Sequence, residues 1–142
     1  MSANAQPIFV GKLRNSSVSV SIGSTSADGS GSIKLFQADI TNGSRVHAIS
    51  CVHTDDISSA TVARLWIENA TNYTLISEIP IPLYNRVVGV PAPIASLLDY
   101  VYAEYLDPAD RFLTLAPGDS LYISVYDTVE SALHVTAWGG DY

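Results

Sequence analysis

Leu121-Tyr122-Ile123-Ser124-Val125-Tyr126 alternates aliphatic with more polar side chains, directly after the turn-forming run Ala116-Pro117-Gly118-Asp119. A period of two places alternate side chains on opposite faces of an extended chain, so this stretch predicts a β-strand. Similar short runs recur between Asn15 and Trp138, and nearly every one ends at a cluster of Gly, Pro, Asn or Asp. The pattern predicts an all-β fold, an antiparallel β-sandwich.

Eight to nine strands are expected on this basis, at residues 16–22, 33–40, 45–54, 60–68, 73–80, from 100, 112–115, 121–126 and 133–138. Residues 80–95 hold four of the seven prolines and predict an irregular crossover, with a short pairing at 86–90. Long connections of this kind are typical of a jelly roll, which is built from two Greek keys. The fold is therefore expected to be jelly-roll-like.

Three local signals add detail to this outline. Asn42-Gly43 predicts a tight hairpin that pairs strand 33–40 with strand 45–54. The polar run 23–32 predicts a flexible surface loop, and it lacks the glycine and lysine spacing of a phosphate-binding loop. Ser96-x-x-Asp99 resembles a capping box and predicts one helical turn at 95–99.

The length of 142 residues fits one domain, which buries roughly 70% of the surface that its unfolded chain exposes. We expect residues 1–14 to form an N-terminal arm, with a short strand at Ile8-Phe9-Val10, and residues 15–142 to form the single β-sandwich domain. The N-terminal run lacks the features of a signal peptide, and no run approaches the ~20 apolar residues of a membrane span. We therefore expect no membrane contact.

Charge argues against a nucleic-acid partner. The net charge is −7, and the two lysines and five arginines are scattered along the chain. Binding to phosphates needs clustered Lys and Arg, which this pattern does not supply.

Candidate catalytic and metal-binding residues form no convincing set. His47, Cys51 and His53 share a face of a regular strand, but His47 and Cys51 lie about 13 Å apart along it, too far to share one ion without a bulge. Cys51 is the only cysteine and is expected to be a small buried hydrophobe. The acidic pair Asp55-Asp56 falls where a turn is expected, and no nucleophile elbow is present. We expect a non-enzymatic protein with no cofactor and no metal.

Aromatic residues are the more informative group. Tyr122 and Tyr126 share one parity, opposite the aliphatic face of their strand. Tyrosine is enriched at protein interfaces, so contact with another subunit is preferred here over contact with a ligand, although a carbohydrate platform remains an alternative. The strand that holds Trp66 is expected to be covered on both faces. The candidate residues for a subunit or capsid interface are Ile8, Phe9, Tyr122, Tyr126 and Trp138.

Residues 16–142 resemble a group of small virion proteins of tailed bacteriophages. The resemblance lies in TNGSRVHAISCVHTDD (41–56), ATVARLWIENATNYTLISEIPIP (60–82), LAPGDSLYISVYD (115–127) and HVTAWGGDY (134–142). It implies a capsid decoration (cement) subunit, a homotrimer seated on the major capsid protein at the exterior of a phage head. The alternatives are a carbohydrate-binding, lectin-like module and a tail or minor head protein. The resemblance implies no particular functional residue.

Overall fold

Nine β-strands and one short helix make up the part of the chain that the structure describes, residues 11–102, 106 and 112–142 of a computed structural model. In chain order the strands are β1 (Lys12–Val20), β2 (Ile33–Gln37), β3 (Ser44–His53), β4 (Thr61–Asn69), β5 (Asn72–Ile81), β6 (Ile94–Ser96), β7 (Leu113–Leu115), β8 (Ser120–Val125) and β9 (Leu133–Asp141). A 3₁₀-helix, η1 (Leu97–Tyr100), follows β6. No helix among these residues is long and apolar enough to span a membrane.

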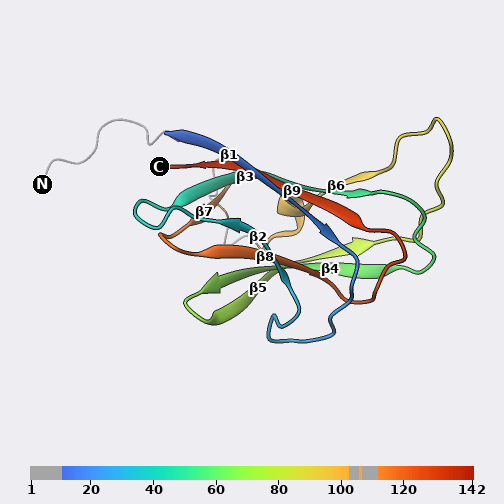
Figure 1. Ribbon diagram of the computed structural model, residues 1–142, viewed down its shortest axis with the longest axis horizontal. Coiled ribbons are helices and arrows are strands. Elements are labelled where there is room, and N and C mark those ends of the chain that lie inside the picture. Colours follow the sequence, from blue (N-terminus) through green and yellow to red (C-terminus); the bar gives the residue numbers. More distant parts are fainter. Residues whose placement is uncertain (1–10, 103–105, 107–111) are drawn as a thin grey trace, which may run out of the picture.

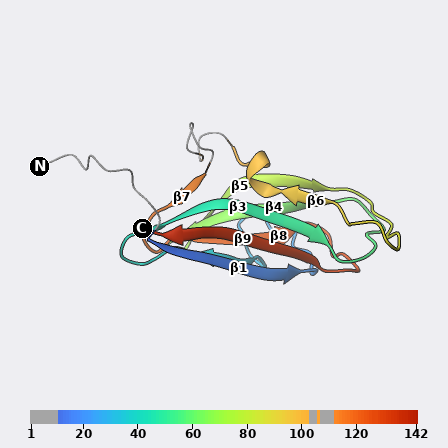
Figure 2. The same cartoon turned by 90° about the horizontal axis from the view of Figure 1, so that it is seen from above.

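The strands form two antiparallel sheets that pack face to face (Figure 1). The first sheet has the order β1-β9-β3-β6, and β7 pairs with β3 on the same edge as β6; the second sheet has the order β2-β8-β4-β5. Successive strands or strand pairs therefore alternate between the sheets, in the order that two Greek keys produce in a jelly roll. Figure 2 shows the first sheet from outside, with β1 along one margin. The fold expected from the alternating pattern is confirmed.

Strand β8 shows how the alternation produces the core. Leu121, Ile123 and Val125 point between the sheets and are fully buried, whereas Tyr122 points outward and is half-buried. Inward-facing aliphatic residues from both sheets complete one continuous cluster around them. Burial of each such side chain contributes roughly 1.5–3 kcal/mol, so the two-residue period favours this sandwich over other arrangements of the strands.

The Asn42-Gly43 turn joins strands of different sheets, so the predicted pairing across it is wrong. β2 pairs with β8, while β3 pairs with β9, β6 and β7. Gly43 does adopt a left-handed backbone, with φ of 77°, and the Asp39 carboxylate accepts hydrogen bonds from the N–H groups of Thr41 and Asn42. These residues fix the turn locally. Which strands pair is decided by partners far away in the sequence.

The crossover after β5 also differs from expectation. The pairing predicted at residues 86–90 does not form; instead, Tyr84 and Ile57 exchange two backbone hydrogen bonds of 2.8 and 2.9 Å. Pro82, two residues before Tyr84, restricts longer pairing on that side, because proline donates no backbone hydrogen bond.

The helical turn lies at Leu97–Tyr100, so it begins two residues later than predicted and ends one residue later, and the Ser96 side chain makes no capping hydrogen bond. Of the strand predicted from Tyr100, the described residues form isolated bridges, between Val101 and Ser77 and between Leu106 and Leu113. Residues 103–105 and 107–111 lie outside the described part of the chain.

The first strand starts at Lys12, four residues earlier than predicted. Residues 12–14, which the sequence assigns to the arm, pair with residues 139–141 of β9. Since β9 itself extends to Asp141, it offers a hydrogen-bonding partner that the sequence pattern of the first strand does not reveal. The strand expected at Ile8-Phe9-Val10 lies outside the described residues.

Loop 23–32, between β1 and β2, is folded onto the outer face of the second sheet. Arg64 of β4 donates a hydrogen bond of 3.1 Å from Nη1 to the carbonyl oxygen of Ser26. Asp28 accepts hydrogen bonds from Ser26 and Ser30, and these bonds lower the pKa of its carboxyl to about 2. The stretch predicted to be a flexible loop is therefore an ordered cover on the sheet.

Trp66 of β4 is buried on this outer face, with only 2% of its surface exposed. The loop contacts the face on either side of it, through Arg64 and through Gly29, whose Cα packs against Tyr73. The indole Nε1 donates a hydrogen bond of 3.1 Å to Ser124 Oγ. The expectation that this strand is covered on both faces is confirmed, and the cover belongs to the same chain.

Candidate functional site

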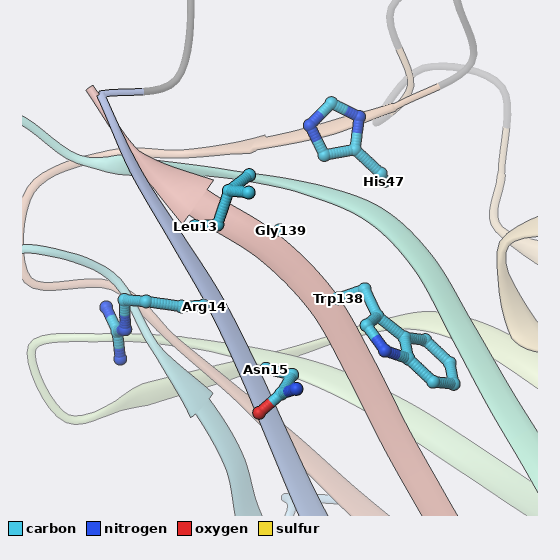
Figure 3. Close-up of a pocket in the computed structure, with 6 residues that line it drawn as sticks. All are labelled: Leu13, Arg14, Asn15, His47, Trp138 and Gly139. Atoms are coloured by element: carbon cyan, nitrogen blue, oxygen red, sulfur yellow. The ribbon is translucent and has the colours of Figure 1, made fainter.

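An open groove on the outer face of the first sheet is the candidate functional site (Figure 3). Its volume is about 370 Å³. Leu13 and Asn15 come from β1, Trp138 comes from the adjacent β9, and His47 comes from β3. Leu13 is 83% exposed and Trp138 is 43% exposed, so the groove presents apolar surface outward.

A β-bulge in β3 brings His47 to this groove. Val46 pairs with Gly139 and Ala48 pairs with Trp138, which leaves His47 as an extra residue without a partner in β9. The bulge shifts the alternation of β3 by one residue, so that His47 lies outside and Cys51 lies in the core.

The prediction that His47, Cys51 and His53 share one face is therefore wrong. Cys51 and His53 point inward and are buried, while His47 is exposed. Burial raises the pKa of the Cys51 thiol to about 12. Within the described residues, no three His, Cys, Asp or Glu side chains lie close enough together to hold a metal ion.

Gly139 allows the two central strands to approach closely at the bulge. A Cβ atom at this position would lie 2.0 Å from the carbonyl oxygen of Arg45 and 2.9 Å from the Cα of Val46. Only glycine fits there, because both neighbouring atoms belong to backbone. The shape of the groove thus depends on a residue without a side chain.

Two arginines next to the groove each contact an aromatic ring. Arg45 stacks on the ring of Phe112, with its guanidinium carbon 4.2 Å from the ring centroid. Although His47 is exposed, its partial desolvation and secondly the charge of Arg45 lower its pKa, so that its imidazole is neutral at pH 7. The Arg14 side chain extends away from the groove (Figure 3), and its guanidinium carbon lies 4.7 Å from the ring centroid of Phe36.

Beneath the groove, a polar cluster joins β1, β9 and β3. Arg14 Nη1 and Ser44 Oγ each donate a hydrogen bond to Asp141 Oδ1, at 2.8 and 2.6 Å. Burial on its own raises the pKa of the Asp141 carboxyl, but these two hydrogen bonds and the positive charge of Arg14 outweigh it, and the pKa is lowered. The cluster fixes the strand ends that carry the groove.

The sequence-based candidates for an interface fall on different surfaces. Trp138 lies in the groove, but Tyr122 and Tyr126 lie on the outer face of the second sheet, on the opposite side of the sandwich. Ile8 and Phe9 lie outside the described residues. The three candidates that the structure describes are therefore not brought together into one site.

Tyr122 is largely occupied within its own chain. Its ring packs edge-on against Tyr73 at 5.1 Å, and desolvation, with further contributions from Glu68 and Tyr73, raises its pKa to about 12. Tyr126 is more accessible, and the guanidinium carbon of Arg64 lies 4.8 Å from its ring centroid. Of the two tyrosines, Tyr126 is the better placed to contact a partner.

The sequence reasoning missed an exposed apolar loop at residues 82–94. The loop projects from the end of the sandwich opposite the C-terminus (Figures 1 and 2). Val88, in the middle of this stretch, is 98% exposed, and other large apolar side chains of the stretch are also exposed: Leu83, Val87, Val90 and Ile94. The signal was the pair of valines among prolines and glycine, which the expected crossover left without a role.

No family model, curated protein or solved structure matches this chain. The site must therefore be judged on its own chemistry. The groove offers apolar contact from Leu13 and Trp138, an amide from Asn15 and a neutral imidazole from His47. This set of side chains suits the binding of a molecular surface or of a flat polar ligand.

Proposed function

We propose that the chain is a non-enzymatic structural subunit of a bacteriophage head, a decoration or cement protein that binds the shell and further copies of itself. The observation that carries the proposal is the exposure of large apolar side chains at two separate places on a rigid sandwich, the groove at Trp138 and the loop 82–94. Contiguous exposed apolar surface marks sites of protein or membrane contact. Of these two kinds of contact, the resemblance to virion proteins favours contact with a protein.

Charge supports a protein partner over a lipid surface. The chain has a net charge of −7, and loop 82–94 contains a single charged residue, Arg86. An anionic membrane repels a protein of negative net charge, and attachment through a surface loop needs clustered Lys and Arg, which this loop does not have. An apolar protein surface has no such requirement.

The loop is also mechanically suited to contact a shell. It projects beyond the strands at one end of the sandwich, so it can meet a flat lattice before any sheet does (Figures 1 and 2). At its base, the two backbone hydrogen bonds between Tyr84 and Ile57 fix its direction. A loop held in this way loses less conformational freedom on binding than a free segment would.

Binding to purified heads tests the proposal. Heads from a phage that lacks the gene are incubated with the chain, and bound protein and heat survival of the shell are measured. We expect saturable binding with a fixed number of copies per head, and a higher temperature of shell disruption. Binding should be lost in Val88→Asp and retained in Ile40→Asp, which makes the same change at another exposed apolar residue. Absence of saturable binding by the unaltered chain would exclude the role.

Carbohydrate binding is a second candidate, favoured by the groove itself. The exposed indole of Trp138 lies beside Asn15 and His47, and a flat ring next to hydrogen-bonding groups can pack against a sugar. A glycan array with the unaltered chain and Trp138→Ala tests this candidate. Glycan signals that disappear in the variant would support it, and an array without signal would exclude it for the glycans present.

A further inference from the structure

The four sheet edges of this sandwich are protected to very different degrees. β5 carries Pro80 and has a bulge at Ile76, β2 is five residues long with an irregular register, and β6 and β7 are three residues each. Proline, bulges and short length are three means by which edge strands avoid pairing with another chain, and charged side chains are a fourth. β1 has no proline or bulge, it spans nine residues, and its pairing with β9 is continuous; its two charged residues, Lys12 and Arg14, lie at its start.

The free side of β1 presents a regular row of backbone donors and acceptors. Tyr142 donates its N–H to the Gly43 carbonyl on the β3 side, so the even-numbered residues of β9 hydrogen-bond to β3 and the odd-numbered ones to β1. The β1 residues paired with these odd positions, including Ser16 and Val18, are bonded to β9. The residues between them direct their N–H and C=O groups to the open edge: Leu13, Asn15, Ser17 and Ser19.

The burial of β1 shows that its edge is unfinished. Arg14, Ser16 and Val18 point toward the space between the sheets but are only half-buried, whereas Val20 at the end of the strand is buried. In the described part of the chain, β9 is the only strand that pairs with β1. Figure 2 shows β1 as the outermost strand of the first sheet. A further strand beside it would cover these side chains.

We infer that β1 pairs in antiparallel fashion with β1 of a second copy, so that the first sheets of two copies join into one continuous sheet. The inference rests on the self-association in the proposed function and names its surface. An antiparallel pairing of a strand with itself is two-fold symmetric and closes as a dimer. It therefore predicts two copies, where the resemblance implies three.

The chemistry of β1 makes a second copy a suitable occupant. From Asn15 to Val20 the strand has no charged residue, so no like charges oppose each other across the two-fold axis. In a pairing centred on Ser17, Asn15 lies opposite Ser19 on the outer face, and Ser16 lies opposite Val18 on the inner face. The two-fold axis thus places inner residues opposite inner residues and outer residues opposite outer ones, so the sheet continues with the same two faces.

Ser17→Pro, with Ser17→Ala as the matched control, tests the pairing. Proline removes an N–H that faces the open edge and leaves the bonds to β9 intact, so the variant is expected to fold. Both variants lose the 2.8 Å hydrogen bond between Ser17 Oγ and Thr136 Oγ1, and only proline blocks the edge. The mass in solution is measured by light scattering over a concentration series, with thermal unfolding as the check on folding.

We expect a dimer for the unaltered chain and for Ser17→Ala, and about tenfold or greater weakening of the dimer for Ser17→Pro. Amide exchange supplies a second readout: in the dimer, the N–H groups of Asn15, Ser17 and Ser19 should exchange more slowly as the concentration rises. If folded Ser17→Pro forms the same dimer or trimer as the unaltered chain, and those amides exchange fast, the pairing of β1 with β1 is overturned. Self-association through another surface would then be retained. A monomer at every concentration would overturn both, while binding to heads is decided separately by the Val88→Asp experiment.

Discussion

Replacement of Gly139 by alanine should lower the free energy of unfolding by about 3–5 kcal/mol, at the upper end of what single substitutions do. The added Cβ would lie 2.0 Å from the carbonyl oxygen of Arg45. Ordinary contacts between carbon and oxygen are no closer than about 3.3 Å, so β3 and β9 would have to separate by roughly 1 Å. Both are central strands, and the separation stretches the hydrogen bonds on each side of the bulge.

Such a loss is a large part of a total stability of about 5–15 kcal/mol. Urea unfolding followed by far-ultraviolet circular dichroism measures it as a lower midpoint with an unchanged slope. Gly89→Ala is the control: Gly89 has φ of 79°, and a Cβ there meets nothing within 4 Å. Gly89→Ala should lower the free energy of unfolding by about 1 kcal/mol, the strain of a left-handed backbone at alanine.

A Gly139→Ala chain that unfolds within 1 kcal/mol of the unaltered chain would refute this reasoning, because a clash between two backbones has no flexible side chain to absorb it. A change in Gly89→Ala as large as that in Gly139→Ala would refute it as well. In that case the loss would come from the generic cost of replacing glycine and not from the contact at the bulge.

Three further outcomes are expected. Folding lowers the pKa of Asp141 below its ordinary value of 3.8, so the stabilisation that the carboxylate supplies is full above pH 3.8 and is lost as the pH falls through the native pKa. Asp141→Asn should therefore lower the free energy of unfolding at pH 7 by about 2 kcal/mol and make that free energy less dependent on acid pH. Urea midpoints measured between pH 7 and pH 2 check both effects. The Cys51 thiol is buried and its pKa is about 12, so a thiol reagent at pH 8 should modify the native chain only as fast as the chain unfolds. Mass spectrometry measures the rate of modification, which should rise with urea. Asp28→Ala should speed amide exchange in loop 23–32 without changing exchange in β9, since Asp28 holds that loop together.

The fold could be predicted because its signal is local and repeated. In β8, each aliphatic residue lies two positions from the next, and the same period recurs in other strands, so the sandwich follows from short stretches read one at a time. The jelly-roll character followed from the length and proline content of the crossover. Both inferences use properties that do not depend on distant partners.

The wrong predictions concern strand pairing and side-chain orientation, which depend on partners far away in the sequence. Asn42-Gly43 fixes a turn, but its flanking strands pair with β8 and β9, which lie far away along the chain. The position of His47 depends on a bulge that Gly139 makes possible, so the parity of β3 changes within the strand. For the candidate site, Trp138 was identified from its aromatic character, whereas Leu13 was assigned to the arm because nothing local indicates that β9 extends far enough to pair with it.

The two tryptophans give this molecule separate optical reporters. Trp66 is enclosed between the second sheet and loop 23–32, and Trp138 faces solvent on the first sheet. Emission from an enclosed indole shifts to the red when the loop opens or the chain unfolds, whereas emission from an indole in water shifts to the blue when another surface covers it. A Trp66→Phe chain would therefore signal association alone, and a Trp138→Phe chain would signal folding alone, without any attached dye.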